Sequence, residues 1–280
     1  MERIDLHIHS IYSDGSFTPE EIVYRAKKLK LKVISITDHD SISGIEEEIE
    51  AGKKLKVEIV PGVEMSTDVG NDEIHILGYY IDWKNKIFLT QLKIFQESRA
   101  KRNKKLVERL KELGMPVNYH ELKKLAAKGG VVNRLHIARL MKEKGYVSSI
   151  GEAFEEWLNP GKPAYIKRMK VSPFEIIQLI LDIGGIPVFA HPYLSKRDDL
   201  IADFVKAGLK GIEVYHSAHN AQAEQHYRKI AQKYHLLITG GSDCHGKNKD
   251  KILMGTVNVP ATLLENLKKE KEKLKCSLLI

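Results

Sequence analysis

The sequence predicts an α/β fold built around a largely parallel sheet or barrel. Short apolar, β-branched segments such as residues 32–37 and 186–190 alternate with longer segments whose apolar residues recur at helical spacing. A hydroxyl residue followed by proline and glutamate, which is the signature of a helix start, stands at residues 18–21 and again at 172–175. Alternation of strands and helices is typical of folds with parallel strands.

Residues 4–10 are expected to form the first strand. Side chains in a strand alternate with a period of two, so His7 and His9 lie on one face and can grip one metal ion. A lone His-x-His pair is nevertheless more often the polar face of a half-buried strand. The next elements, in chain order, are a helix capped by Thr18 and Glu21 that runs through Leu29, a strand at 32–37, a helix capped by Ser43 and Glu46 that runs to Leu55, and strands at 57–60 and 73–78.

The alternation stops between residues 87 and 160. Residues 88–113 carry apolar side chains at helical spacing between many charges, which predicts one long amphipathic helix. We expect residues 1–86 and 161–280 to form the barrel unit, and residues 87–160 to form a helical insertion that caps the strand-end face. Shorter helices are predicted within this insertion near 121–128, 136–144 and 152–158.

Most lysines and arginines of the insertion are interpreted as a solvated helix surface. Arg134 and His136 differ, because they stand at a predicted helix start, where backbone N–H groups favour anions and an arginine suits a phosphate. After the insertion we expect a helix over 172–183, ended by Gly184 and Gly185. Strands at 186–190, 210–215, 236–239 and 256–259 follow, before a last helix that opens with a Thr262–Glu265 capping box.

Composition narrows the class of protein. The 280 residues are 42% hydrophobic and carry a net charge of +8, which favours an anionic substrate or merely reflects a lysine-rich surface. No apolar run approaches the ~20 residues of a membrane span, and no signal peptide precedes the first strand. The only cysteines, Cys244 and Cys276, give no case for a disulfide, so we expect a cytoplasmic protein. The oligomeric state stays open.

Acids and imidazoles gather at or next to predicted strand ends, where α/β folds build their active sites. Each alone would be an ordinary polar residue, but together they indicate one centre that needs cations to keep its carboxylates from repelling one another. Histidine with carboxylate suits Zn²⁺, Mn²⁺ or Fe²⁺, and this many groups suit two or three ions. Cys244 is interpreted as buried filler. The expected ligands are His7, His9, Asp14, His39, Glu64, His75, His191, Asp243 and His245.

These motifs resemble those of the PHP (polymerase and histidinol phosphatase) family, in order and over nearly the whole chain. The matching segments are His7-x-His9 with Asp14, residues 37–39, 61–64, His75, 190–192 and 241–245. The resemblance implies a distorted (β/α)7 TIM-like barrel, the PHP fold, holding up to three divalent ions. The insertion after His75 is similar to the branch of nucleoside 3′,5′-bisphosphate phosphatases and 5′→3′ exoribonucleases that act on short RNA.

The resemblance also implies roles for single residues. His7, His9, Glu64 and Asp243 would hold one ion, Glu64 with His75 and His191 a second, and Asp14, His39 and His245 a third. Some relatives have histidine in place of Asp14, which leaves two-ion occupancy open. Arg134 matches a phosphate-binding arginine of the branch. Relatives often carry Gly-Arg-Tyr after the His-Pro, whereas this chain has residues 193–195 (Tyr-Leu-Ser), so Lys196 or Arg197 would have to replace that second arginine.

The expected chemistry is phosphoester hydrolysis by a metal-activated hydroxide, with Asp14, His39, Glu64 and Asp243 as catalytic residues. The proton donor to the leaving group stays open between His216, His219 and His136. Expected substrates are 3′,5′-bisphosphonucleosides and short single-stranded RNA. The alternatives are another small phosphomonoester such as histidinol phosphate, and a non-catalytic metal-binding or regulatory module.

Overall fold

The computed structural model describes residues 2–70, 72–125, 130–167, 169–248 and 251–277, and its strands form two sheets. The four-stranded sheet has the order β3-β2-β1-β9. In it β1 (Arg3–Ile8) pairs in parallel with β2 (Leu31–Ile36), β2 pairs in parallel with the short β3 (Glu58–Ile59), and β9 (Val259–Pro260) runs antiparallel to β1. The predicted strands at 57–60 and 256–259 are therefore shorter than expected.

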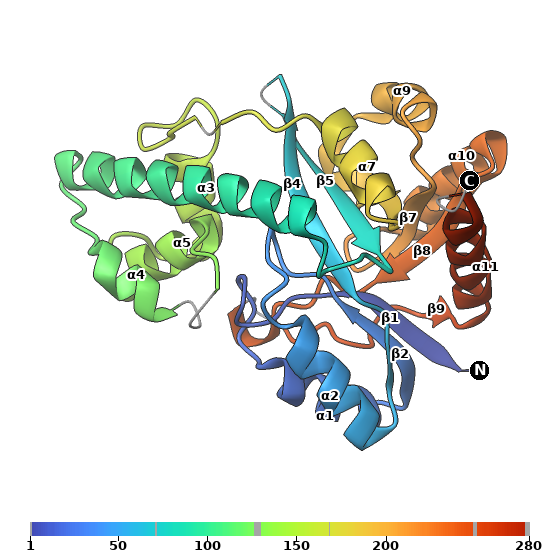
Figure 1. Cartoon of the computed structure of the whole chain (residues 1–280). Coiled ribbons are helices and arrows are strands. Elements are labelled where there is room, and N and C mark those ends of the chain that lie inside the picture. Colours follow the sequence, from blue (N-terminus) through green and yellow to red (C-terminus); the bar gives the residue numbers. More distant parts are fainter. Residues whose placement is uncertain (1, 71, 126–129, 168, 249–250, 278–280) are drawn as a thin grey trace.

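The five-stranded sheet has the order β4-β5-β6-β7-β8 and mixes both strand directions. β4 (Gly62–Val69) and β5 (Asp72–Tyr79) form a long antiparallel ribbon, visible at the centre of Figure 1. β5 is also antiparallel to β6 (Ile186–Phe189), whereas β6, β7 (Gly211–His216) and β8 (Leu237–Gly241) are parallel. No helix separates β4 from β5, which is why the strands reverse here.

The mixed α/β class is confirmed, but among the described residues the strand ladders do not close into one barrel. The two sheets meet at two isolated bridges, Ile8 with Cys244 and His39 with Glu64. Both bridges lie where β1 and β2 end, so the sheet edges converge at the residues expected to bind metal.

Helices cover the outer faces of both sheets (Figure 1). α1 (Pro19–Lys28) and α2 (Ile45–Leu55) pack on each other beside the four-stranded sheet. The five-stranded sheet is covered by α7 (Pro173–Asp182), α9 (Ile201–Lys206), α10 (Ala221–Tyr234) and α11 (Thr262–Ser277). Short helical turns follow β6 and β8, at Pro192–Ser195 (α8), Asp198–Leu200 and Gly246–Asn248.

Of the predicted capping boxes, only the one at Thr18 is confirmed, with Glu21 bonding back to the Thr18 backbone. The prediction for α2 is wrong, because its N-cap is Gly44 and no side chain caps it. Ser172 is the N-cap of α7 but makes no side-chain cap bond, and α11 begins at Thr262 itself. The helices still form as predicted, because their apolar faces are buried against the sheets.

The segment between β5 and α7 is helical. It comprises α3 (Lys86–Glu112), α4 (Tyr119–Leu125), α5 (Arg134–Glu143), α6 (Ile150–Glu152) and a π-helical turn at Ala153–Leu158. Part of the helix predicted at 121–128 lies outside the described residues. This segment, termed the insertion below, has its own apolar cluster, which includes Leu106, Leu110, Leu122, Ile137 and Met141.

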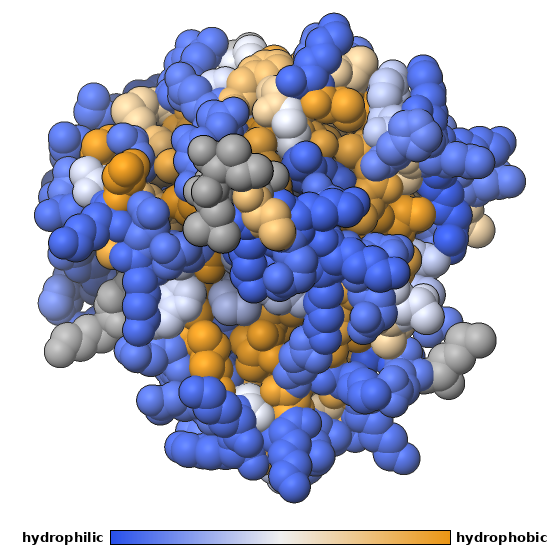
Figure 2. Space-filling view, turned by 45° about the vertical axis from the view of Figure 1, so that its right-hand side comes forward, coloured by the Kyte–Doolittle hydropathy of each residue, from blue (hydrophilic) through white to orange (hydrophobic). Residues whose placement is uncertain are grey.

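The main apolar core lies between the five-stranded sheet and its helices, and a smaller cluster beneath α1 and α2 contains Cys244. The interpretation of Cys244 as buried filler is confirmed. Figure 2 shows a mostly hydrophilic face on which hydrophobic side chains surface only in small groups between charged ones. None of the described helices combines the length and the apolar character needed to cross a membrane.

Candidate metal centre

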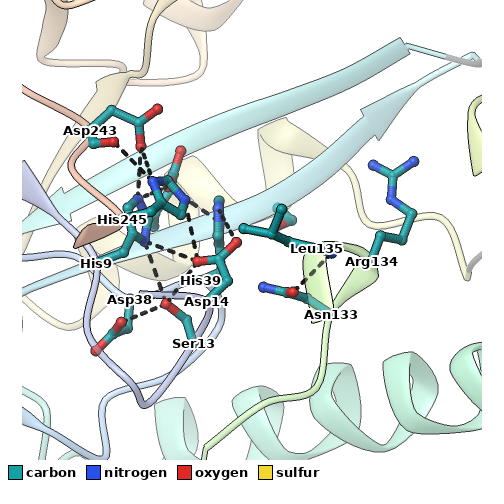
Figure 3. A network of polar contacts seen from close by, with 12 residues as sticks. His9, Ser13, Asp14, Asp38, His39, Asn133, Arg134, Leu135, Asp243 and His245 are labelled. Carbon is teal, nitrogen blue, oxygen red and sulfur yellow. Dashed lines mark hydrogen bonds and ion pairs between the residues drawn. The ribbon is translucent and has the colours of Figure 1, made fainter. Parts of the chain in front are cut away.

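All nine expected ligand residues lie together at the edge where the two sheets converge, and Figure 3 shows part of this network. Most come from the end of a parallel strand or from the loop after it, as expected. Glu64 and His75 do not, because both lie inside strands, Glu64 near the start of β4 and His75 near the middle of β5. Their ribbon is antiparallel, and it brings these strand positions level with the ends of β1 and β2.

Glu64 is fully buried and stands at the centre of the cluster. Its Oε1 lies 2.8 Å from His75 Nδ1 and 3.0 Å from His191 Nε2. Its Oε2 lies 3.1 Å from His7 Nε2, 3.2 Å from His9 Nε2 and 3.2 Å from His39 Nδ1. Five imidazoles thus surround one carboxylate.

We term His7, His9, Glu64 and Asp243 the first ligand group. Asp243 Oδ1 lies 3.7 Å from His7 Nε2 and 3.1 Å from His9 Nε2, and the Glu64 contacts are of similar length. Ligand atoms on a tetrahedral ion with bonds of about 2.1 Å are separated by about 3.4 Å. The spacing of this group therefore suits one small divalent ion.

The second ligand group, Glu64, His75 and His191, is equally compact, with His75 Nδ1 3.3 Å from His191 Nε2. The third ligand group is Asp14, His39 and His245. Here Asp14 Oδ1 lies 3.3 Å from His245 Nε2, and Asp14 Oδ2 lies 3.9 Å from His39 Nε2. His39 also reaches Glu64 through its other ring nitrogen, so it stands between the second and third groups.

Hydrogen bonds behind the cluster fix the tautomers of two histidines. His7 Nδ1 donates to the buried carboxylate of Glu213 at 3.0 Å, and His245 Nδ1 donates to the Asp243 carbonyl at 2.9 Å. A neutral imidazole has one N–H, so Nε2 of each ring keeps its lone pair for a metal ion. Glu213 also accepts the His191 backbone N–H at 2.8 Å.

Sequence reasoning missed Glu213, along with two other buried carboxylates, Asp5 and Asp38. Asp38 accepts hydrogen bonds from the hydroxyls of Ser10 and Ser13, and Asp5 accepts from the backbone of the loops after β8. Burial raises the pKa of both Asp5 and Asp38. The available signal was a lone acid within an otherwise apolar strand, as in Ile212-Glu213-Val214.

Burial and the charges of neighbouring ligand residues shift the pKa values of these residues strongly. Although burial opposes it, the carboxylates of Asp243 and Glu64 raise the pKa of His9 to about 9, and Glu64 and Glu73 raise that of His75 to about 10. Burial lowers the pKa of His39 to about 3. Despite their burial, Asp14 and Glu64 have pKa values held well below the usual range by the surrounding imidazoles.

The backbone is strained at two of these residues. His191 has φ +27° and Asp243 has φ +52°, in the left-handed region that residues other than glycine rarely adopt. Such strain persists only where the surroundings enforce it, and it is common at functional sites. Here the Glu213 carboxylate holds the His191 backbone, and the His7 carbonyl accepts the Asp243 N–H at 2.8 Å.

The residues fit divalent ions by two criteria. Buried ring nitrogens of His9 and His39 have no hydrogen-bond partner among the described residues, although carboxylate oxygens lie close to them. Burying a ring nitrogen without a partner costs free energy, and a cation held between the nitrogen and the carboxylate oxygen would remove this cost. The donor set of imidazole and carboxylate is also that of Zn²⁺, Mn²⁺ and Fe²⁺ sites.

A cavity of about 110 Å³ opens beside Asp14, His39 and His75, and Arg134 and Arg99 also line it. A larger cavity of about 300 Å³, lined mainly by polar residues together with Pro160, Tyr165 and Leu194, shares Arg134 and Glu73 with the first. Arg134 forms an ion pair with Glu73, and Arg99, from α3, pairs with Asp40. Arg99 was not anticipated, because its charge is one of many on α3.

Three other expected substrate-binding residues, His136, Lys196 and Arg197, are not among the residues that line these two cavities. His136 is buried, and its Nδ1 accepts the Asn133 N–H in a capping box, while burial lowers its pKa to about 4. Arg197 is held by Asp72 and Asp199. Lys196 caps a short helix in a left-handed conformation and does not line either cavity.

Of the proposed proton donors, His216 and His219 lie behind the first ligand group. His216 Nδ1 accepts the Ala218 N–H, so the proton of its neutral ring is on Nε2, which is 3.6 Å from Asp243 Oδ2. His219 Nδ1 donates to the Val214 carbonyl, and burial lowers the pKa of His219. The two rings lie 5.2 Å apart between centroids.

Comparison with known proteins gives consistent similarities. The chain is 34% identical over 267 residues to a 5′-3′ exoribonuclease of Haemophilus influenzae, a match that spans 90% of this chain and 96% of the relative. It is 32% identical over 250 residues to a 3′,5′-nucleoside bisphosphate phosphatase of Chromobacterium violaceum, with 88% of each covered. It superimposes, with a TM-score of 0.89 and 27% identity over 96% of both chains, on a Bifidobacterium adolescentis protein described as a metal-dependent phosphoesterase.

The family model of the PHP domain matches residues 5–160, which is more than half of the chain and includes six of the nine expected ligands, from His7 to His75. The other three, His191, Asp243 and His245, complete the same cluster in space. From the model match, the similarity of the relatives and the arrangement of these residues, we conclude that the chain belongs to the PHP domain family.

Proposed function

We propose that the protein is a metal-dependent phosphoesterase that hydrolyses phosphomonoesters of nucleotides, chiefly 3′,5′-bisphosphonucleosides, and that also removes nucleotides from the 5′ end of short RNA. The observation that carries this proposal is the ring of five imidazoles around Glu64. A buried carboxylate needs no more than a few hydrogen-bond donors, so this excess of nitrogen ligands supports a multi-ion centre. The functions of the two similar relatives support the choice of phosphate ester.

Within this centre the first group would hold one ion, the second group another, and the third group a further ion of lower affinity. Two or three ions of Mn, Zn or Fe fit the ligands. When bound, such ions supply a water of low pKa and neutralise charge on the phosphoryl group. In the neutral rings of His7 and His245, the bonds of Nδ1 to Glu213 and to the Asp243 carbonyl would leave Nε2 available to an ion.

The chain's own residues would bind the ester and assist its leaving group. Arg134 lines the same cavity as His39 and His75, and its guanidinium would suit a phosphate once it leaves Glu73. We favour His216 as the proton source, because its hydrogen bond from Ala218 keeps the proton on Nε2. His216 would pass its proton on by way of Asp243, whose Oδ2 lies 3.6 Å from His216 Nε2.

The cavities favour a nucleotide over histidinol phosphate. Together they extend from the metal ligands past Arg134 to Tyr165, and Phe154 lines the part next to the ligands. Aromatic rings next to a phosphate site suit a nucleobase, which stacks on such rings with about 1–3 kcal/mol per base. A non-catalytic module is disfavoured, because it would not need a strained, complete ligand cluster that opens into a cavity.

Three further proposals concern the fold, the insertion and the location of the protein. The sheets would act as one distorted TIM-like barrel, since bridges at Ile8 and at His39 tie their edges. Residues 87–160 would form a unit that caps the site, since Arg99 and Arg134 reach the cavity from it. A cytoplasmic location is supported by the two cysteines, which form no disulfide.

The test is a substrate panel with matched variants. Phosphate release would be measured with a 3′,5′-bisphosphonucleoside, a 5′-phosphorylated short RNA and histidinol phosphate, after chelation and again after adding back Mn²⁺ or Zn²⁺. We expect the nucleotide to be preferred, and Glu64→Ala and Asp243→Ala to abolish release. Asp203→Asn, on the exposed surface of α9, is the control that should retain wild-type rates. Substantial activity in both site variants, or a preference for histidinol phosphate, would contradict the proposal.

A further inference from the structure

Two loops that carry the third ligand group are joined by one buried side chain, Asn248. The backbone N–H of Asn248 donates to the His245 carbonyl at 3.3 Å. Its side-chain Nδ2 donates to the Asp14 carbonyl at 2.7 Å. Asn248 is only 4% exposed, so these bonds are shielded from water. Asn248 therefore connects the loop of Asp14 to the loop of His245, beside a second link from the Lys247 N–H to Ser16 Oγ at 2.7 Å.

The other end of this amide is held by the insertion. Arg139, on α5, donates from Nη1 to Asn248 Oδ1. An arginine can only donate and a backbone carbonyl can only accept, so the side chain between them must offer one acceptor and one donor. A carboxamide does so, and its orientation is fixed by its two partners. Asn248 thus links α5 to Asp14.

A second connection reaches the same loop from the other side. The Val131 N–H donates to the Tyr12 carbonyl at 3.0 Å, two residues before Asp14. Val132, next to it, is held in turn by the buried Asn103 of α3, whose Nδ2 donates to the Val132 carbonyl at 2.7 Å. The loop of Asp14 is therefore attached to the insertion at two points.

The first ligand group is held differently. His7 is fixed by Glu213 on β7, and the Asp243 N–H bonds to the His7 carbonyl of β1. Glu64 lies within the β4–β5 ribbon. These supports belong to the sheets, so a change at the surface of α5 should leave the first group in place while it loosens the third.

We infer that Asn248 and Arg139 are positioning residues that couple the insertion to the third ligand group and set the affinity of the last ion to bind. This inference rests on the proposed function only for its metal centre. Groups that orient metal ligands in this way are typically worth 10–100-fold in affinity. Loss of either residue should therefore weaken the last binding step by about that factor and leave the earlier steps unchanged.

The experiment counts Mn²⁺ ions per chain, by equilibrium dialysis and elemental analysis, over a range of free Mn²⁺. Asn248→Asp keeps the shape and the contact with Arg139 but turns an acceptor toward the Asp14 carbonyl. Arg139→Gln removes the link from the α5 side. Arg109→Gln is the matched control, because Arg109 is another arginine of the insertion, and its bond to the Pro163 carbonyl does not involve the loops of Asp14 and His245.

We expect the wild type and Arg109→Gln to bind three ions with the same midpoints, and both test variants to shift only the third midpoint, by about 10–100-fold. Unchanged third midpoints, equal weakening of every step, or a wild type that binds only two ions would each overturn the inference. In those cases the proposed function stands as long as two ions bind, whereas a wild type that binds none refutes both. Thermal melting of the ion-free variants shows whether they are folded, and Arg139→Gln carries the test if Asn248→Asp is not.

Discussion

Glu213→Gln is the most informative change near the metal centre, because it alters one buried group that lines neither of the two cavities beside the ligands. Glu213 accepts His7 Nδ1–H at 3.0 and 3.2 Å and the His191 backbone N–H at 2.8 Å. Glutamine has nearly the same shape but replaces one acceptor oxygen with an NH₂ donor. One of the two N–H groups must then face a donor.

The size of the effect follows from this conflict. A buried donor that loses its acceptor costs about 1–3 kcal/mol. If the new NH₂ group faces His7 Nδ1–H, the ring can change tautomer and move its proton to Nε2. The lone pair that Nε2 would donate to the first ion is then lost. At 1.4 kcal/mol per factor of ten, the cost corresponds to about 5–150-fold weaker binding of that ion.

The assay is competition for Mn²⁺ or Zn²⁺ between the protein and a chelator of known affinity, with folding checked by circular dichroism. Glu224→Gln is the matched control, because Glu224 is a partly exposed acid on α10 that pairs with Arg228 of the same helix. The reasoning is refuted if folded Glu213→Gln binds its ions within about twofold of wild type.

Three further outcomes are expected. The pKa values of His9, about 9, and His75, about 10, mean that both rings carry a second proton at pH 7 in the ion-free protein. Metal ions must displace these protons, so the affinity for metal should rise with pH up to this range. Titration calorimetry in two buffers of different ionisation enthalpy should detect the released protons, and heats of binding that do not depend on the buffer would contradict this expectation. Thr18→Ala should lower the free energy of unfolding by about 1 kcal/mol in denaturant, and Ser172→Ala by clearly less, because only Thr18 makes a cap bond; equal losses would speak against the capping argument. Leu110→Ala, in the apolar cluster of the insertion, should cost about 2–5 kcal/mol by the same measurement, and a loss under 1 kcal/mol would mean that this cluster contributes little.

The strand-end pattern predicted the cluster well because it depends only on local sequence. His7, His9 and His39 lie where two-residue periodicity and the ends of β1 and β2 put them. The same pattern places Glu64 and His75 correctly beside the other ligands, but the reason is wrong, because both residues lie inside strands and not at strand ends. A reversal of strand direction depends on which strands pair, and pairing is set by contacts between residues far apart in the chain.

Supporting groups could not be predicted in the same way. Glu213 is a single acid in a strand, and Asn248 a single amide in a loop, and neither belongs to a motif. Their roles depend on hydrogen bonds to residues far away in the sequence. Glu213 bonds to His7, and Asn248 bonds to Arg139. Capping signals at Ser43 failed for a related reason, since burial of a helix face suffices to define a helix without a side-chain cap.

The β4–β5 ribbon separates two tasks along its length. Next to the ends of β1 and β2 it carries Glu64, which five imidazoles contact. Further out, Asp68, Asp72 and Glu73 line the larger cavity. Mutations near the far end would thus change the lining of the larger cavity, which we propose receives the ester, without touching the expected ion ligands. One scaffold can in this way diverge toward new phosphorylated compounds without rebuilding its reactive centre.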